Sequence, residues 1–238
     1  MRILGLIPAR GGSKGIPRKN LVDLCGKPLV YYSVVYGNKL LEKGLISECI
    51  VSTDDLEIAS ISAFYGGTPF IRPDFLAKDE TKTVDVVLHA LQEFVEFDVV
   101  ALIQPTSPIR SIQDFEECLQ LLSDRESVVS VYEDEDKSHL IYKKDGTPLS
   151  QIHGSGIRRQ DLGSHYIRNG AIYLTKTSCI FGQNSMVDDQ PGLHLMSKIR
   201  SLKLDTLEDL ELLRAVFQKQ WQLSDESSNG FPGCTVTV

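Results

Sequence analysis

A basic, glycine-rich segment near the amino terminus carries the side chains best suited to chemistry. Between Arg10 and Asn20 the chain places four cations, three glycines and a serine, just after the apolar run Ile3–Ile7. Lysine and arginine side chains supply the positive charge that binds phosphate groups, and glycines let backbone N–H groups approach a ligand closely. We therefore predict a phosphate-binding loop at the carboxyl end of a strand.

Two familiar phosphate motifs do not describe this loop. A Walker A motif requires Ser or Thr after its lysine, whereas Gly15 follows Lys14. The three glycines lack the spacing of the dinucleotide fingerprint, and Pro17 prevents a helix from beginning at once. A solvated basic turn is the simplest alternative. The number of cations, together with the hydroxyl of Ser13 and the amide of Asn20, favours phosphate binding.

Alternating strands and helices are expected to position this loop. Apolar runs predict strands at Ile3–Ile7, Cys49–Ser52, Val99–Ile103, Val128–Tyr132, Ala171–Leu174 and Ile199–Leu204. Helical spacing predicts helices at Pro28–Leu41, Leu56–Tyr65, Val84–Phe94, Ile112–Leu122 and Thr206–Phe217. Thr206 and Asp209 match the capping-box pattern. The alternation predicts an α/β fold with a mostly parallel, doubly wound, Rossmann-like sheet covered by helices on both faces.

The carboxyl ends of the predicted strands hold further polar side chains. Ser52–Asp54, Gln104–Ser107 and Asp205 each follow a predicted strand. Because ligands of such sheets bind beyond the carboxyl ends of the strands, these residues should meet the Arg10–Asn20 loop at one edge.

Charge and composition limit the class of function. The net charge is −7, yet the first 27 residues hold six cations against one anion, so the rest of the chain carries −12. A local positive field in an acidic protein suits a small polyanion such as a nucleoside triphosphate, whereas nonspecific nucleic-acid binding needs a basic face. No apolar stretch approaches the roughly 20 residues of a membrane span. The five scattered cysteines, without CxxC pairs, predict reduced thiols in the cytoplasm.

The chain length of 238 residues predicts a single domain, which we place at residues 1–221. Residues 133–167 interrupt the alternation with a polar segment that includes an apparent hairpin around Lys144–Gly146. Such an insertion is more often functional than idle. Residues 222–238 are polar and contain Gly and Ser, so we expect a flexible tail.

These motifs resemble those of the CMP-N-acylneuraminate (CMP-sialic acid) synthetases, the acylneuraminate cytidylyltransferase family. The first family motif matches Arg10, Ser13, Lys14-Gly15 and Lys19-Asn20. The likeness continues at Ser52-Thr53-Asp54-Asp55, Arg72-Pro73, Gln104-Pro105-Thr106-Ser107-Pro108, Arg159-Gln160, Asn169-Gly170-Ala171-Ile172-Tyr173 and Leu204-Asp205-Thr206. It spans roughly residues 3–215, and the first and the Gln104 motifs are the specific ones.

The resemblance implies a reaction, a cofactor and an assembly. The anomeric hydroxyl of an acidic nine-carbon sugar would attack the α-phosphorus of CTP, giving CMP-sugar and pyrophosphate. Mg²⁺ would assist at the α-phosphate, because such a displacement needs charge neutralisation and strict positioning. In the family, the segment matching residues 133–167 is an arm that embraces a second subunit and reaches its active site. A homodimer is therefore expected, with neither a nucleic-acid nor a membrane partner.

The resemblance also assigns roles to residues. The catalytic residues would be Arg10, Lys19 and Asp205. The CTP-binding residues would be Arg10, Ser13, Lys14, Lys19, Asn20 and Arg72. The sugar-binding residues would be Gln104, Thr106, Ser107, Arg158, Arg159 and Tyr173. Asp205 would be the metal ligand.

Structural roles compete with several of these assignments. Arg72 could be a surface arginine paired with Asp74 or Asp79, and Gln104 could merely tie down the turn that follows it. Other polar residues have plain structural explanations: Arg18 and Lys27 as solvated cations, Arg158 and Arg159 as a solvated pair, His89 and His139 as structural histidines, and Asp54-Asp55 as a helix cap.

One position departs from the family. Before Thr206 the family often carries two carboxylates, spaced two apart so that both point to one face of a strand. Here the second is Asp205, but Lys203 occupies the first position. Mg²⁺ commonly takes one or two protein carboxylates and completes its shell with phosphates and water, so Asp205 alone can still be its ligand.

Three alternative functions remain open at this stage. The nearest is the same chemistry on legionaminic or pseudaminic acid, which the sequence does not distinguish from sialic acid. The others are an NTP-hydrolysing switch, disfavoured by Gly15 after Lys14, and a noncatalytic nucleotide-binding module.

Overall fold

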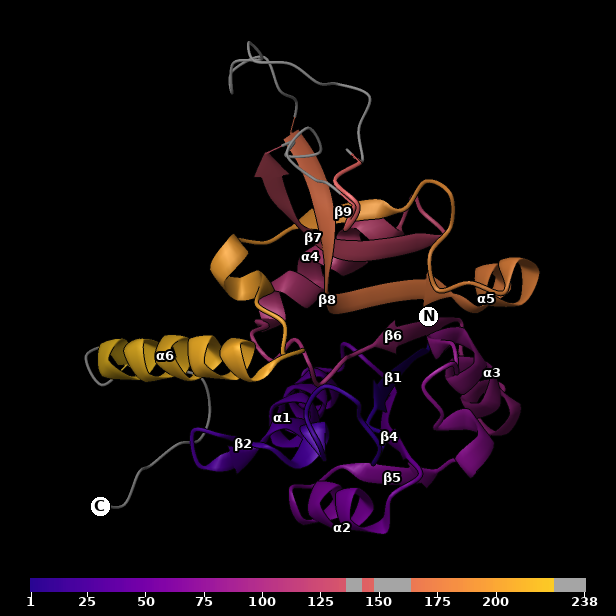
Figure 1. Cartoon of the computed structure of the whole chain (residues 1–238). Helices are drawn as coiled ribbons and strands as arrows, with labels where there is room; N and C mark the ends of the chain where they lie inside the picture. Colours follow the sequence, from indigo (N-terminus) through magenta and orange to yellow (C-terminus); the bar gives the residue numbers. More distant parts are fainter. Residues whose placement is uncertain (136–142, 148–163, 225–238) are drawn as a thin grey trace.

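The computed structural model describes residues 1–135, 143–147 and 164–224, and a β-sheet runs through this part of the chain (Figure 1). Within it, seven strands form the sheet in the order β5-β4-β1-β6-β8-β7-β9. Their bounds are β1 Ile3–Pro8, β4 Glu48–Thr53, β5 Thr68–Ile71, β6 Val99–Leu102, β7 Ser127–Glu135, β8 Ser164–Lys176 and β9 Gly192–Leu195. Strands β2 (Asp23–Leu24) and β3 (Lys27–Pro28) form a separate short ribbon.

Strand direction confirms the mostly parallel sheet. Neighbouring strands are parallel from β5 through β4 and β1 to β6, and again between β7 and β9. Strand β8 alone is reversed, since it pairs antiparallel with both β6 and β7. The amino-terminal half of β8 therefore lies toward the edge where its parallel neighbours end. This direction brings Gly170 against Gln104.

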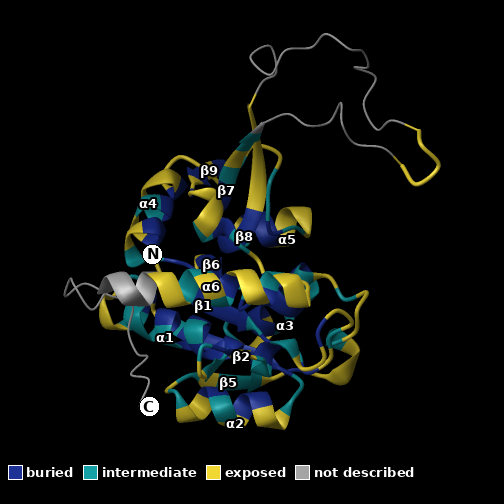
Figure 2. Cartoon of the chain, turned by 60° about the vertical axis from the view of Figure 1, so that its left-hand side comes forward, coloured by how far each residue is buried: buried dark blue, intermediate teal, exposed yellow. Residues whose placement is uncertain are grey.

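Helices cover both faces of the sheet, as the doubly wound arrangement requires. The helices are α1 Leu29–Glu42, α2 Leu56–Phe64, α3 Thr83–Glu93, α4 Ile112–Leu122 and α5 Thr177–Gln183. On one face Ile7 of β1 shares a core cluster with Val34 of α1 and Phe115 of α4. On the other face Leu6 belongs to a cluster with Val87 of α3. Figure 2 shows β1 and β6 buried between the layers.

Side-chain caps begin two helices where the sequence predicts them. The Asp55 carboxylate accepts hydrogen bonds from the backbone N–H groups of Glu57 and Ile58, both at 3.0 Å, at the start of α2. Helix α6 (Leu207–Ser224) begins with the predicted capping box, in which Asp209 accepts from Thr206 N at 2.7 Å. Among the described helices, none has the length and apolar character that a membrane crossing needs.

The predicted strand Ile199–Leu204 is wrong. Residues Lys198–Ser201 form a 3-10 helix, η5, and an irregular segment follows. The leucines of this run pack outside the sheet, and Leu204 shares an apolar cluster with Leu210 of α6. The backbone N–H of Leu204 donates to Thr106 O at 2.8 Å. Strand β9, which the sequence analysis missed, occupies the sheet edge beside β7 instead. The leucines of the run Ile199–Leu204 are therefore explained by packing against α6 and not by a strand.

The insertion begins and ends in the sheet. Strands β7 and β8 remain paired out to Glu135 and Ser164, and this ribbon rises away from the other strands in Figure 1. Residues 143–147 form the predicted turn, with Gly146 N donating to Lys143 O at 2.9 Å. The rest of the predicted 133–167 arm, at 136–142 and 148–163, lies outside the described residues. Helix α6 extends to Ser224, and the remainder of the predicted tail, 225–238, also lies outside them.

Candidate active site

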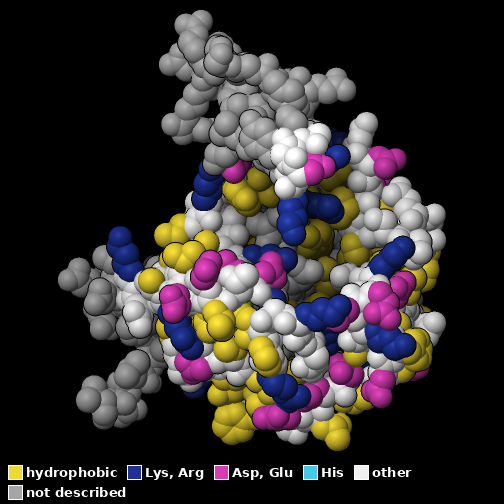
Figure 3. Space-filling model, in the orientation of Figure 1, with side chains coloured by type: hydrophobic (Ala, Val, Ile, Leu, Met, Phe, Trp, Pro, Cys, Tyr) yellow, Lys and Arg dark blue, Asp and Glu magenta, His cyan; other side chains and the backbone are white. Residues whose placement is uncertain are grey.

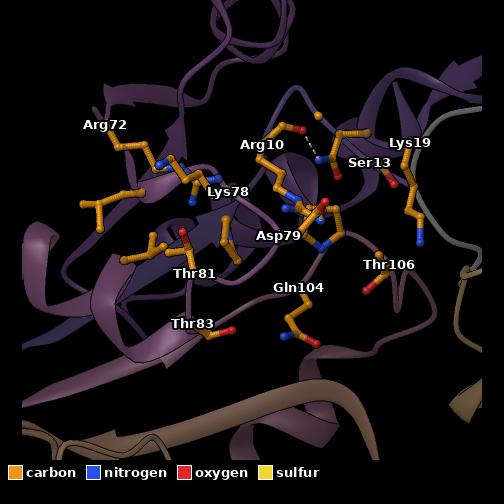
Figure 4. Close-up of a pocket in the computed structure, with 16 residues that line it drawn as sticks. Arg10, Ser13, Lys19, Arg72, Lys78, Asp79, Thr81, Thr83, Gln104 and Thr106 are labelled. Carbon is orange, nitrogen blue, oxygen red and sulfur yellow. Dashed lines mark hydrogen bonds and ion pairs between the residues drawn. The ribbon is translucent and has the colours of Figure 1, made fainter. Parts of the chain in front are cut away.

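An open cleft of about 280 Å³ lies at the carboxyl ends of β1, β5 and β6 (Figure 4). Three parts of the chain line it: the end of β1 with the loop that follows, the segment after β5 with the first turn of α3, and the turn after β6. The lining residues are Pro8, Arg10, Gly12, Ser13, Lys19, Asn20, Arg72, Leu76, Lys78, Asp79, Thr81, Thr83, Val86, Gln104, Pro105 and Thr106. The cleft thus brings together Arg10, Ser13, Lys19, Asn20, Arg72, Gln104 and Thr106 from the predicted set.

Two of the loop glycines allow close contacts with other parts of the chain, and a third lines the cleft. A Cβ on Gly11 would lie 2.5 Å from Asp55 Oδ2, and one on Gly15 would lie 2.6 Å from the backbone oxygen of Asp205. At Gly12, which lines the cleft, a Cβ would meet nothing within 4 Å. Gly11 and Gly15 therefore hold the loop against α2 and the turn before α6.

The cations of the loop are paired with acidic side chains. Arg10 Nη2 lies 2.7 Å from Asp79 Oδ1, and Lys14 Nζ lies 3.0 Å from Asp79 Oδ2. Elsewhere in the loop, Arg18 forms ion pairs with Asp55 and Glu57 at the start of α2, so it is not simply solvated. Figure 3 shows basic and acidic side chains interspersed over this face of the molecule. The expected positive field is thus neutralised by partners close to the cations.

Lys19 and Asn20 hold the loop closed. The Lys19 ammonium, whose side chain is 14% exposed, donates to Leu204 O at 3.0 Å and pairs with Asp205 Oδ1 at 3.1 Å. The buried Asn20 amide donates to Arg10 O at 2.8 Å. Both side chains line the cleft while they tie the loop to other parts of the chain.

Arg72 is buried, so the surface ion pair considered for it is wrong. Its side chain is 3% exposed, and its Nη2 lies 3.8 Å from Asp54 Oδ1. The same Asp54 oxygen accepts from Gly11 N at 3.0 Å, which links Arg72 to the Arg10–Asn20 loop. Burial lowers the pKa of Arg72. Its Nε is also buried and has no hydrogen-bond partner among the described residues, which is uncommon for a buried polar group.

The turn after β6 is built around Gln104. Gly170 has a φ of +78°, which favours glycine, and its Cα lies so close that an added Cβ would be 2.7 Å from Gln104 Oε1. Ser107 is fully buried, and its hydroxyl donates to Asn169 O at 2.9 Å. Tyr173 packs against an apolar cluster of the sheet. The structure therefore leaves Ser107 and Tyr173 outside the lining of the cleft, although both were predicted to bind sugar.

Asp205 lies between two lysines at the start of α6. Its Oδ1 faces Lys19, and its Oδ2 lies 2.9 Å from Lys203 Nζ. Partial burial alone would raise the pKa of Asp205, but hydrogen bonds from Lys203 and Lys19 bring it below its ordinary value. Lys203 and Asp205 therefore form an ion pair although the predicted strand Ile199–Leu204 is absent here.

A magnesium ion carried by a nucleotide fits these residues better than a site made of protein ligands alone. Within the described residues, no group of three or more His, Cys, Asp or Glu side chains could hold a metal. Asp205 nevertheless offers a half-exposed, ionised carboxylate beside Lys19 of the cleft. One carboxylate is sufficient where phosphates and water complete the shell.

The remaining predictions fall away from the cleft. His89 lies in α3 with its ring 5.1 Å from that of Phe70, a packing role. Lys27 lies over the rings of Tyr31 and Tyr65 at 5.3 and 5.4 Å. Arg158, Arg159 and His139 lie outside the described residues.

Comparison with known proteins identifies the family. A sequence model described as cytidylyltransferase matches residues 4–224. The chain belongs to the cytidylyltransferase family. This membership confirms the resemblance drawn from the motifs and classes the chain among nucleotidyltransferase sequences.

The relatives of this cytidylyltransferase family member differ in chain length and in the sugar that their names give. The chain is 30% identical over 92% of its length to N-acylneuraminate cytidylyltransferase of Escherichia coli O18:K1:H7, of which it spans 53%. It therefore spans about half the length of the first curated relatives it matches. It is 32% identical over 95% of its length to CMP-N,N'-diacetyllegionaminic acid synthase of Legionella pneumophila, of which it spans 99%.

The fold is also that of a solved relative. The structure of CMP:2-keto-3-deoxy-manno-octonic acid synthetase complexed with CTP superimposes with a TM-score of 0.68 at 17% identity, covering 92% of this chain and 100% of the other. At this identity the match supports the fold alone.

Of the segment between β5 and α3, only Arg72 belonged to the predicted site of this cytidylyltransferase family member. Lys78, Asp79 and Thr81 also line the cleft, as does Thr83 at the start of α3. The only sequence signal was the polar run from residue 78 to residue 83, just before the predicted helix Val84–Phe94. Its role depends on the fold, because the segment follows β5, which lies two strands away from β1 in the sheet.

Proposed function

We propose that this protein couples CTP to a sialic-acid-like nonulosonic acid and releases CMP-sugar and pyrophosphate. The observation that carries the proposal is the cleft in which the Arg10–Asn20 loop, Arg72 and the Gln104 turn meet, and in the described part of the chain the Nε of Arg72 has no partner. Family membership of residues 4–224 supports the same chemistry. In the reaction, the anomeric oxygen bonds to the α-phosphorus, the bond to the β-phosphate breaks, and the hydroxyl proton is released.

The cations of the loop would bind the phosphates. Arg10 and Lys19 line the cleft, and Lys14 shares the Asp79 partner of Arg10, so all three can turn toward one polyanion. Arginine suits bidentate contacts, and lysine acts as a point charge. The Ser13 hydroxyl adds a donor from the cleft wall. Asn20, whose amide donates to Arg10 O within the loop, would contact the nucleotide.

Arg72 and Gln104 would recognise the two substrates on different sides of the cleft. In Figure 4, Arg72 comes from the segment after β5, whereas Gln104 and Thr106 come from the turn after β6. Arg72 would bond the nucleotide through its partnerless Nε. Gln104, held by the close approach of Gly170, would orient the sugar, and Ser107 and Tyr173 would support that segment from behind.

Asp205 would hold Mg²⁺ together with the nucleotide phosphates. When bound, the ion would neutralise phosphate charge and polarise the α-phosphate. Lys19 and Lys203, which occupy the two carboxylate oxygens in the structure, would release one of them. Both ammonium groups would then remain close to the phosphates and add positive charge there.

A homodimer is part of the proposal. Exposed apolar side chains lie on a strand that leads to the insertion and on the edge strand beyond its neighbour: Tyr166 and Ile167 of β8, and Leu193 and Leu195 of β9. Contact with a second subunit would cover such side chains. The arm would carry Arg158 and Arg159 as anchors for the sugar carboxylate. The proposal places the dimer in the cytoplasm, as the scattered cysteines predict.

The experiment is a matrix of substrates. Each of the four nucleoside triphosphates is incubated with sialic, legionaminic and pseudaminic acids in turn, with Mg²⁺, and pyrophosphate release is measured. Release that requires CTP and one of the three acids supports the proposal and names the sugar. Hydrolysis of a triphosphate without sugar would indicate a switch, and binding without turnover would indicate a nucleotide-binding module; either result contradicts the proposal.

A further inference from the structure

Asp79 lines the cleft and pairs with two cations of the Arg10–Asn20 loop. Its Oδ1 pairs with Arg10 Nη2 at 2.7 Å and its Oδ2 with Lys14 Nζ at 3.0 Å. Figure 4 shows Asp79 directly beside Arg10 in the cleft. One carboxylate thus joins two cations through its two oxygens, which is how a phosphate group would bind them.

The partners of Asp79 distinguish it from the other acidic residues around the loop. Asp55 pairs with Arg18 but also caps α2, and Asp54 accepts the Gly11 N–H beside Arg72. Within the described residues, the Asp79 side chain bonds only Arg10 and Lys14. These two cations lower the pKa of Asp79, so the group is a carboxylate anion at neutral pH. Its displacement would leave the α2 cap and the contact between Asp54 and Gly11 intact.

We propose that Asp79 is an internal competitor for the phosphate groups of the nucleotide. It pairs with Arg10 of the cleft and with the exposed Lys14 before a nucleotide binds, and is displaced when a phosphate chain binds. The inference rests on the proposed function, since it concerns how the same cleft admits CTP. It makes Asp79 a positioning residue that sets nucleotide affinity through two cations.

The segment that carries Asp79 would respond to this exchange. Lys78, Thr81 and Thr83 line the same cleft, and Arg10 Nη1 also donates to Ala77 O at 3.4 Å. The segment is therefore tethered to the phosphate loop chiefly through Arg10 and Asp79. Once phosphate replaces Asp79, that tether is lost and the segment can settle on the bound nucleotide.

Competition predicts an effect on phosphate-bearing ligands alone. Removing the Asp79 charge should strengthen binding of CTP and of pyrophosphate, whereas cytidine, which has no phosphate, should be unaffected. Both ion pairs are partly exposed, and such pairs are individually weak, so we expect a gain of about three- to tenfold in affinity.

The test measures dissociation constants by calorimetry for CTP, pyrophosphate and cytidine. Asp79→Asn, and Asp79→Ser as a second variant, should lower the constants for CTP and pyrophosphate and leave the cytidine constant unchanged. Asp79→Glu, which restores the charge, should return them toward the wild-type values. Glu80→Gln is the matched control, because it removes the same charge from the neighbouring exposed residue of the segment.

The outcomes separate this inference from the proposed function. If the wild type binds CTP and neither Asp79 variant binds it more tightly, the competitor role is overturned while the function stands. An equal gain for cytidine or in Glu80→Gln would also overturn it. If CTP does not bind but pyrophosphate does, the proposed function fails, and the pyrophosphate constants still decide the role of Asp79. If neither CTP nor pyrophosphate binds to the wild type or to any variant, both the proposed function and the competitor role are overturned.

Discussion

Lys19 and Asp205 lie 186 positions apart in the sequence, yet the lysine ammonium is 3.1 Å from the aspartate carboxylate. The same lysine bonds Leu204 O, and a Cβ on Gly15 would fall 2.6 Å from Asp205 O. The phosphate loop and the turn that begins α6 are therefore one structural unit. A change on either side should alter the position of the other.

Asp205 should be required for metal-dependent turnover. Asp205→Asn keeps the size of the side chain but removes the charge that would attract Mg²⁺, and the α6 capping box of Thr206 and Asp209 is untouched. We expect turnover to fall by about 100-fold or more, as for the loss of other transition-state electrostatics. Steady-state rates across a Mg²⁺ titration measure this.

Lys203→Asp provides the comparison for Asp205. It should shift the Mg²⁺ concentration that gives half-maximal rate while activity persists, because it replaces a paired cation with a second carboxylate. A wild-type rate and Mg²⁺ response in Asp205→Asn would instead make Asp205 a structural residue.

Arg10 and Lys19 should each be essential for catalysis. Arg10→Ala and Lys19→Ala remove cations that line the cleft and should lower the rate of pyrophosphate release by about 100-fold or more. Arg18→Ala is the matched control, since this cation of the same loop pairs with α2 and does not line the cleft. Near-normal rates in both cleft variants, with folding verified by circular dichroism, would end the phosphate-loop interpretation.

Gly15 should be needed for the fold of the loop. Gly15→Ala places a methyl group against the backbone of Asp205, which cannot move aside as a flexible side chain could. We expect a loss of about 1–3 kcal/mol in the free energy of unfolding, measured by urea denaturation. Gly12→Ala, where the added methyl group meets nothing within 4 Å, should be nearly neutral. Equal stability of the two variants would contradict the close approach of loop and turn.

Asp114 should make stability depend on acidity. Burial alone would raise its pKa, but hydrogen bonds from His194 and Ser111, with Arg200 nearby, lower it to about 2 from 3.8. A carboxyl group with a lowered pKa stabilises the fold above its unfolded pKa, and that contribution disappears as pH falls through its folded pKa.

The contribution of Asp114 should therefore be complete above about pH 4 and be lost toward pH 2, with a magnitude on the order of 2 kcal/mol. Urea denaturation of the wild type and Asp114→Asn across this range measures it. The variant should be less stable at pH 6, and the difference should shrink with acidification. A difference that stays constant from pH 6 to pH 2 would refute the assignment.

Much of the site could be predicted because it follows from strand ends. Strands β1 and β6 are continuous apolar runs, and the polar residues directly after them, Arg10 and Gln104, had to lie at the same edge of a parallel sheet. The capping residues Asp55 and Thr206 were equally readable, because helix caps depend on a few neighbouring positions.

What the sequence could not reveal depends on contacts between distant segments. Arginine side chains are usually exposed, and only the fold shows that Arg72 is buried near Asp54. The run Ile199–Leu204 is as apolar as a strand, but its leucines pack on α6. The pairing of Asp79 with Arg10 likewise requires the segment after β5 to cross toward β1. Periodicity contains no information on any of these partners.

The most direct test of the central claim follows the phosphorus atoms of CTP. Phosphorus NMR of the full chain with CTP, Mg²⁺ and the active nonulosonic acid should show one pyrophosphate appearing for each new CMP phosphodiester, with neither forming when the sugar is left out. Release of inorganic phosphate, or of pyrophosphate together with free CMP at the same rate without sugar, would contradict the account.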